Sequence, residues 1–522
     1  MDLEATVAQP VKREFRAVVL SGFGNELIPL TSDYSAEPCP KALIPVGNKP
    51  IIDYVFSWLD SSGIKDVLLI CPSTHKGAIS HHIHSDLTAA SSSLRIDVQT
   101  YDESMEMPGG TCALLRHFSS RITEDFVVLP CDFIPPPSLP LSSILNKFRA
   151  ESVGDGALAT TCWFASTQPD KNAIVEDWGS LPAPSPIVWD QSTGTLLHID
   201  NPDDLDRNSE ELELRMSLLS HYPRTRLSTK FQDSHVYVCR RSVLDLLHEK
   251  QHFESLREEF IPWLCKIQYQ RVKQEKYTRS TLFSFFLNKN RAHGVIVLSP
   301  ITNTLTQSLA LGHSSLYSSK EHREKKGHDT PDDIEPSSPD GSDKPTDLSS
   351  LRVGVVIHEG PGYATRVNTI HSLLEINRRL LSETTYALPT EQKSRSLIDQ
   401  KAQISSDSII GDFTQVSEKT TIKKSVIGRH CVIGKMTKIV GCVLFDHCII
   451  EDGAKLDGCV LGKSTKVGAK AELTRIVTQA GYEVSPGDST KNEKLEVSDW
   501  TADVGDEDED GDEDEDEGEE SE

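Results

Sequence analysis

A repeat of five- and six-residue steps near the end of the chain constrains its fold more than any other feature. Thirteen aliphatic residues follow one another at these steps without a gap, and they are Ile404, Ile410, Val416, Ile422, Ile427, Ile433, Ile439, Leu444, Ile450, Leu456, Leu461, Val467 and Leu473. An amphipathic helix would need an apolar period of about 3.6 residues, and an amphipathic strand a period of about 2. A period near six is typical of a β-helix, in which each repeat supplies one short strand.

A small residue stands two positions before every one of these aliphatic residues. The series is Ala402, Ser408, Thr414, Thr420, Ser425, Cys431, Thr437, Cys442, Cys448, Ala454, Cys459, Thr465 and Ala471. From Ile410 the steps run 6, 6 and 5 and then repeat, so the pattern returns every 17 residues. We expect the aliphatic side chain to fill the interior and the small residue to let the chain turn a corner. The pattern predicts a parallel β-helix over residues 398–482 whose stacked coils leave flat sides and open ends for partners. The alternative is a run of ordinary strands that fits the period by chance.

The length of 522 residues predicts two or three domains, with two polar stretches outside them. Residues 318–350 are rich in Pro, Ser, Asp and Lys, which predicts a disordered linker or insertion. Residues 503–522 hold fifteen acidic residues and no basic one, so they account for 15 of the 25 net negative charges. Such a tail is a solvated, disordered element or a contact for a basic partner segment. The predicted boundaries are 1–14 for an N-terminal extension, 15–317 for a first domain, 318–350 for the linker, 351–397 for a segment completing the first domain, 398–482 for the β-helix and 483–522 for the acidic tail.

Composition argues against several classes of function. The rest of the chain is only mildly acidic and lacks the clustered Lys and Arg of a nucleic-acid interface. No secretory signal precedes Arg16, and no apolar run approaches the length of a membrane span. The eleven cysteines lack metal-binding spacing, and four of them occupy the small position of the repeat. A reduced, cytosolic compartment is the simplest interpretation.

The first part of the chain alternates apolar strand-like runs with helical stretches, which predicts an α/β sheet over residues 15–300. A short buried strand, residues 17–20, runs into a turn that contains Gly22 and Gly24. Glycines after a first strand let backbone N–H groups approach a phosphate. A second glycine pair, Gly109 and Gly110, opens a helix, and a later strand ends at Asp132.

The order of these segments resembles the nucleotidyltransferase family that makes nucleotide-sugars. That family carries G-x-G-T-R-L-x-P-L-T, then P-K-P-L-x-P-V-x-x-K-P, a G-T-A turn and G-D at a strand end, and it often adds a hexapeptide left-handed β-helix. The resemblance implies a Rossmann-like N-terminal domain with a mixed sheet. It also implies that the glycine loop and its arginine bind a triphosphate, that the lysine supports the phosphates and that the aspartate holds Mg²⁺. The matching positions here are Gly22, Gly24, Asn25, Glu26, Lys41, Gly109, Gly110 and Asp132.

Several of these positions depart from the family pattern. Asn25 and Glu26 replace the Thr-Arg pair, so a carboxylate stands where positive charge should meet the triphosphate. Ala42 and Cys131 replace a proline and a glycine, and no W-x-D motif supplies a second metal carboxylate. Lys41 either contacts phosphate or forms an ion pair that caps its loop, and Asp132 is expected to cap the turn that follows it. The site is therefore predicted to be vestigial, with no catalytic residue, no metal and no cofactor, although weak nucleotide or sugar-phosphate binding stays open.

Within this family, the chain resembles the noncatalytic gamma and epsilon subunits of eukaryotic translation initiation factor 2B. The stretches that carry the likeness are 46–50, 198–206, 221–224, 233–238, 256–264, 366–370 and 375–378. The epsilon subunit adds a C-terminal helical domain that performs guanine-nucleotide exchange. This chain is expected to have no room for that domain, so the resemblance favours the gamma subunit. The resemblance implies pairing with epsilon, assembly with beta, delta and alpha in a decamer, and GDP/GTP exchange on initiation factor 2. The alternatives are a working sugar-nucleotide pyrophosphorylase of GDP-mannose type and a ligand-sensing pseudo-enzyme.

Overall fold

The computed structural model describes most of the two predicted domains. It covers residues 14–33, 38–85, 93–102, 110–154, 156–165, 185–199, 214–270, 277, 351–383, 389 and 392–496. The predicted linker, the predicted tail from residue 497 onward and nearly all of the N-terminal extension lie outside these ranges. Within them, no helix has the length and apolar character needed to cross a membrane.

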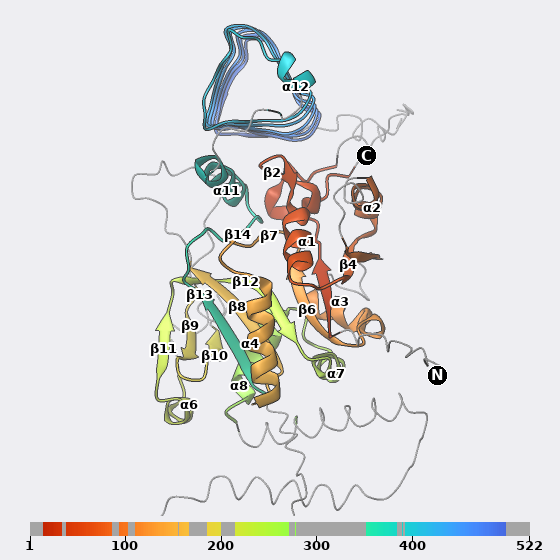
Figure 1. Ribbon diagram of the computed structural model, residues 1–522, viewed down its shortest axis with the longest axis vertical. Helices are drawn as coiled ribbons and strands as arrows, with labels where there is room; N and C mark the ends of the chain where they lie inside the picture. The colour runs from red at the N-terminus through yellow and green to blue at the C-terminus, as the bar shows by residue number, and fades with distance from the viewer. Residues whose placement is uncertain are drawn as a thin grey trace, which may run out of the picture.

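A ten-stranded mixed sheet forms the centre of the N-terminal domain, with strand order β11-β9-β10-β13-β8-β12-β6-β1-β4-β5 (Figure 1). Its strands are β1 (Phe15–Leu20), β4 (Asp66–Pro72), β5 (Arg95–Tyr101), β6 (Asp125–Pro130), β8 (Ala159–Ala165), β9 (Ile187–Asp190), β10 (Thr195–Ile199), β11 (Thr225–Ser228), β12 (Phe231–Cys239) and β13 (Val353–His358). The first four pair in parallel, as expected for an α/β domain. β13, which follows the predicted linker, pairs with both β8 and β10.

Helices cover both faces of this sheet because its central strands are apolar on both sides. Val18 packs into one core, while Ala17 and Val19 pack into the other. The helices are α1 (Ile51–Ser61), α2 (Lys76–Ser85), α3 (Thr111–His117), α4 (Leu141–Gly154), α6 (Met216–His221), α7 (Ser242–Glu249) and α8 (Ile261–Ile267), with short turns η1 (Asn25–Leu27), η2 (Lys41–Leu43), η3 (Ser73–His75), η4 (Ser119–Arg121) and η5 (Leu256–Phe260). α1 and α4 contribute to one core, and α3, α7 and α8 to the other.

The C-terminal domain is a parallel β-helix with three flat faces, seen end-on in Figure 1. The first face holds β15 (Gln403–Ile404), β18 (Thr421–Lys423), β21 (Lys438–Val440), β24 (Lys455–Asp457), β27 (Glu472–Thr474) and β30 (Ser489–Lys491). The second face holds β16 (Ile409–Ile410), β19 (Val426–Ile427), β22 (Val443–Leu444), β25 (Val460–Leu461), β28 (Val477–Thr478) and β31 (Lys494–Leu495). The third face holds β17 (Gln415–Val416), β20 (Val432–Ile433), β23 (Ile449–Ile450), β26 (Lys466–Val467) and β29 (Glu483–Val484).

The repeat predicted the interior of this stack residue by residue. Twelve of the thirteen aliphatic residues are buried, and Ile404, in the first coil, is partly buried. Leu444 pairs with Ile427 in the coil before it and with Leu461 in the coil after it. The 17-residue period therefore places equivalent residues directly above one another.

The coils continue to Leu495, past residue 482, where the predicted β-helix ends. Thr478 takes the next interior position, and its hydroxyl is satisfied by the Gly462 N–H at 3.1 Å and the Thr465 hydroxyl at 3.0 Å. A buried polar group is tolerated when it is hydrogen-bonded in this way. The coil therefore continues through Thr478, although this residue is not aliphatic.

The two domains share a hydrophobic core. Helix α11 (Ile370–Glu383) lies between them in Figure 1, and its apolar side packs with the outward valines of the second face. A hairpin of β2 (Pro45–Val46) and β3 (Lys49–Pro50) adds polar contacts: the Asn48 amide donates to the Ile427 carbonyl at 2.7 Å, and the Gly47 N–H donates to Asn377 Oδ1 at 2.9 Å. The remaining elements are β7 (Phe133–Ile134), β14 (Thr365–Arg366) and α12 (Gln392–Ser396).

Candidate functional site

The glycine turn after β1 forms one wall of the candidate site. Gly24 has a φ of 89°, and a Cβ there would lie 3.0 Å from both Lys41 Cβ and Thr31 Cγ2. Both the backbone conformation and the space therefore require glycine at position 24. Gly22 is exposed, and a Cβ added to it would meet no atom within 4 Å, so its turn is open to solvent.

Asp132, just beyond the end of β6, is the charged centre of the site. Its carboxylate accepts a hydrogen bond from Lys41 Nζ at 2.5 Å, and it accepts two from Arg366, to Oδ1 at 3.1 Å and to Oδ2 at 3.0 Å. The Asp132 side chain is only 2% exposed. The expectation that Asp132 caps the following turn is wrong, because both of its oxygens bind cationic side chains. Of the two roles expected for Lys41, phosphate contact or an ion pair, the structure shows an ion pair, and its partner is Asp132.

Electrostatics keep this buried carboxylate ionised. Burial alone would raise the pKa of Asp132, but the Arg366 guanidinium and the Lys41 ammonium outweigh that effect and hold the pKa well below its usual range. Burial acts to lower the pKa of Arg366, and the charge of Asp132 more than reverses this, so that the pKa is raised. The pair is therefore charged throughout the physiological range.

Arg366 reaches Asp132 from a distant part of the sequence. β14 pairs with β7, which places Arg366 opposite Phe133, and the Val367 N–H donates to the Asp132 carbonyl at 2.9 Å. Residues 366–370 entered the sequence argument through their resemblance alone, and Arg366 was not among the predicted site residues. The one sequence signal for Arg366 was its place in a stretch, residues 366–370, that resembles the family.

The residues present do not fit the divalent metal that the fold family implies. A metal ion at Asp132 would have to displace or sit beside two cations, because Arg366 and Lys41 already make three hydrogen bonds to its two carboxylate oxygens. No group of three or more His, Cys, Asp or Glu side chains is arranged to hold a metal within the described ranges. In place of a metal ion, the positive charges beside the Asp132 carboxylate come from the side chains of Lys41 and Arg366.

A second buried carboxylate, Asp233, lies nearby, although the sequence holds no motif that predicts one. It accepts hydrogen bonds from the Tyr237 hydroxyl at 2.6 Å and the His235 N–H at 2.9 Å, and Arg257 Nε lies 3.7 Å away. β12 is irregular here: its register with β8 shifts between Asp233 and Tyr237, and His235 has a φ of 55°. Burial, followed by the charges of Arg366 and Arg257, lowers the pKa of His235 well below its usual value, so this histidine is neutral.

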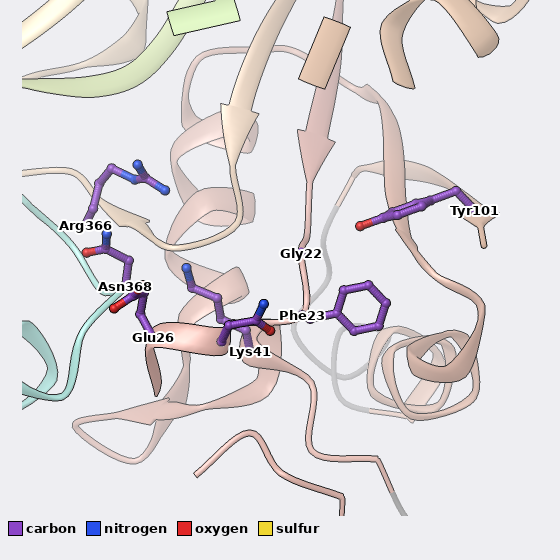
Figure 2. Close-up of a pocket in the computed structure, with 9 residues that line it drawn as sticks. Gly22, Phe23, Glu26, Lys41, Tyr101, Arg366 and Asn368 are labelled. Carbon is purple, nitrogen blue, oxygen red and sulfur yellow. The ribbon is translucent and has the colours of Figure 1, made fainter. Parts of the chain in front are cut away.

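A pocket of about 410 Å³ opens beside this charged cluster, and Figure 2 shows its lining. The charged side chains of Glu26, Lys41 and Arg366 lie on one side of the view, and the rings of Phe23 and Tyr101 lie on the other. The pocket is lined by Gly22, Phe23, Gly24, Asn25, Glu26, Lys41, Tyr101, Arg366 and Asn368. Five of the eight predicted positions therefore meet here, while Asp132 is buried in contact with Lys41 and Arg366.

Gly110, from the second predicted glycine turn, packs against the backbone of Glu254. A Cβ at Gly110 would lie 2.7 Å from the Glu254 carbonyl oxygen, and that oxygen accepts a hydrogen bond from the Cys112 N–H at 2.8 Å. Thr111 Oγ1 in turn accepts from the Leu256 N–H at 2.8 Å. Gly110 does not line the pocket, and Gly109 lies outside the described residues.

The fold and the site define a class: an α/β nucleotidyltransferase domain joined to a left-handed β-helix. The Nucleotidyl transferase family model matches residues 16–171, and the family model for the EIF2B subunit epsilon LbH domain matches residues 391–487. The fold class expected from the sequence is thereby confirmed.

The chain is similar to gamma subunits of translation initiation factor eIF2B. It is 34% identical to the subunit of Schizosaccharomyces pombe, over 50% of this chain and 54% of that protein. It is 26% identical to the Caenorhabditis elegans subunit, over 49% of this chain and 59% of that protein. It is 23% identical to the Dictyostelium discoideum subunit, over 74% of this chain and 81% of that protein. The matches thus span about half the length of the first two relatives. The resemblance drawn from the sequence is confirmed.

Proposed function

We propose that this chain is a noncatalytic, gamma-type scaffold subunit of the initiation factor 2B exchange complex. In this proposal it pairs with the epsilon subunit in the cytosol and joins beta, delta and alpha in a decamer that promotes GDP/GTP exchange on initiation factor 2. The names of the similar proteins support membership of such a complex. The core shared by its two domains suits a scaffold, because a partner that binds both domains meets one continuous body.

The observation that carries the noncatalytic role is the pairing of Asp132 with Lys41 and Arg366. Nucleotidyl transfer needs cations placed where negative charge develops on the phosphates. Here the cations are held by a buried carboxylate, and Glu26 adds an exposed carboxylate to the pocket lining. A carboxylate within a few ångströms of a phosphate costs on the order of a few kcal/mol at a protein-like dielectric.

A turnover assay and a binding assay test the two parts of this proposal. The purified chain is incubated with GTP or UTP, sugar 1-phosphates and Mg²⁺, and pyrophosphate release is measured beside an active pyrophosphorylase. We expect no release above the protein-free background, and we expect the chain to bind purified epsilon subunit. Robust pyrophosphate formation would contradict the noncatalytic role, and failure to bind epsilon would contradict the scaffold role.

A second candidate function is ligand sensing without turnover. The pocket favours it, because Lys41 and Arg366 face the same hollow as the rings of Phe23 and Tyr101. Isothermal titration with GTP and with sugar phosphates tests this function, and the absence of heat at millimolar ligand would exclude it.

A further inference from the structure

The three faces of the β-helix differ in the side chains that they present outward. The second face is covered, because its four outward valines are buried in the core shared with the N-terminal domain. The third face is mixed, since its outward row holds a glutamine, a valine, an isoleucine, a lysine and a glutamate in successive coils. The first face differs from both, because positive charge is concentrated at one end of it.

Six exposed lysines lie on the first face and its corners in the first three coils. These coils are residues 401–407, 418–424 and 435–441, and their only acidic residues are Asp407 and Glu418. The six residues, here called the lysine cluster, are Lys401, Lys419, Lys423, Lys424, Lys435 and Lys438. The whole chain carries a net charge of −25, so this local excess of positive charge runs against its composition.

The nearby carboxylates neutralise only part of the lysine cluster. Glu418 is shared between Lys401 at 3.6 Å and Lys435 at 3.5 Å. Asp407 interacts with the charge of Lys424. Among the described residues, no carboxylate lies within ion-pair distance of the other three lysines, which are Lys419, Lys423 and Lys438.

Strand pairing adds repulsion within the same row of lysines. β21 and β24 pair in parallel and place Lys438 directly beside Lys455 of the next coil. Neighbouring strands lie about 4.8 Å apart, and like charges in directly paired positions destabilise a sheet. Lys455 is relieved by Glu472, whose carboxylate lies 2.7 Å away in the following coil. Lys438 has no such acid in the described part of the chain, so an added anion would relieve it.

The chain carries an anionic segment that can reach this cluster. Residues 503–522 hold fifteen acidic residues and no basic one, and they follow a last coil whose description ends at Glu496. Four strand spacings, about 19 Å, separate the last coil from the second coil of the first face. Residues 497–502 can span about 20 Å when extended, and the acidic run about 66 Å more. The acidic run is therefore long enough to cover the whole cluster.

We propose that residues 503–522 bind the lysine cluster of the first face and withhold it from other polyanions. The Debye length is about 8 Å at physiological salt, so the lysines in contact outweigh the more distant acids of the body. The acidic run holds few apolar residues, so the contact depends on charge and adds little to the melting temperature. Both parts belong to this chain, so the inference does not depend on the proposed pairing with epsilon.

Carbodiimide cross-linking of the full chain tests this contact. The reagent joins a lysine amine to a carboxylate that touches it, and mass spectrometry identifies the linked peptides. Lys455 and Glu472, 2.7 Å apart, form the internal positive control. We expect links between residues 503–522 and the lysine cluster at low salt. These links should disappear at about 1 M NaCl, where the Debye length falls to about 3 Å.

Paired charge reversals show whether the contact is specific to the cluster. Lys423→Glu/Lys438→Glu reverses two of its charges, and the links are then counted at Lys419. Arg429→Glu/Lys466→Glu changes the net charge equally outside the cluster. We expect the first variant to lower the yield of tail links at Lys419 at least about fivefold, and the second to leave it unchanged. The melting temperature checks folding, and if the first variant melts early, Lys423→Gln/Lys438→Gln replaces it with the same expected direction.

Four outcomes would overturn the proposal. The first is the absence of tail links in wild type while the Lys455–Glu472 link forms. The second is an equal yield of tail links in the two variants. The third is a set of tail links that join heavy to light chains in an isotopically mixed sample, which would assign the tail to a second copy. The fourth concerns a single-stranded RNA oligonucleotide as a probe polyanion: we expect deletion of residues 503–522 to tighten its binding at least about fivefold, and equal binding with and without the tail would mean that the cluster is not covered.

Discussion

Replacing Arg366 by methionine should destabilise the N-terminal domain substantially. The change leaves the buried Asp132 carboxylate with Lys41 as its remaining ion-pair partner, and removal of one partner from a buried pair costs about 3–5 kcal/mol. We expect the lower end, about 3 kcal/mol, because Lys41 stays 2.5 Å from Oδ2. For a domain of this size that is a fall of about 6 °C in melting temperature.

Differential scanning fluorimetry on four proteins measures the coupling: wild type, Arg366→Met, Asp132→Asn and the double variant. The double variant should lose less stability than the sum of the single losses, because the two groups act on each other. Arg241→Met serves as the control, since its pair with Asp245 is partly exposed and should change stability by less than about 1 kcal/mol. Additive losses, or a loss at Arg366 no larger than at Arg241, would refute the reasoning.

The same pair predicts a pH dependence. The folded-state pKa of Asp132 lies well below the unfolded value of about 3.9, so its contribution is present above that pH and is lost as pH falls toward the folded pKa. Arg366→Met removes a cation that depresses this pKa, so the variant should lose the contribution at higher pH. Acid unfolding followed by tryptophan fluorescence should therefore begin at a higher pH in the variant. Identical acid-unfolding midpoints would contradict the assignment.

Three further predictions concern other parts of the chain. Glu26→Arg should strengthen GTP binding in isothermal titration before any turnover is restored, because it exchanges a repulsive charge in the pocket lining for an attractive one; unchanged binding would count against the charge argument. Deletion of residues 318–350 and 503–522, both outside the described ranges, should leave the melting temperature within a few degrees, and a large loss would mean that one of them is docked. Leu444→Asp should bury an unpaired carboxylate between Ile427 and Leu461 at a cost of several kcal/mol and should abolish co-purification with epsilon, while limited proteolysis still finds the N-terminal domain folded. The exposed Lys463→Asp is its control, and wild-type assembly by the Leu444 variant would mean that the β-helix does not carry the pairing.

The β-helix could be predicted closely because its determinants are local and periodic. Each interior residue and its small neighbour lie two positions apart, and the coil returns every 17 residues, so Ile427, Leu444 and Leu461 could be aligned without a structure. The predicted domain ends at residue 482, whereas the coils continue to Leu495. The hydroxyl of Thr478 interrupts the aliphatic pattern just before that boundary, and hydrogen bonds keep this residue in the coil.

The candidate site was harder to predict because its contacts join distant segments. Arg366 and Asp132 are separated by 234 residues, and no local pattern indicates that β14 brings them together. The glycine at position 24 followed from its turn, but the pattern around Gly110 predicts a phosphate turn, whereas its neighbour is the Glu254 carbonyl. Sequence motifs indicated which residues belong to the region, and only the tertiary structure showed what each one contacts.

Co-purification from cytosol tests the central claim most directly. The tagged full chain is isolated under native conditions, and its complex is weighed and its subunits identified by mass spectrometry. We predict recovery of epsilon together with the beta, delta and alpha subunits of initiation factor 2B, in a complex that accelerates release of labelled GDP from initiation factor 2. Recovery of the chain without any of these subunits, or in a complex with no effect on GDP release, would contradict the account.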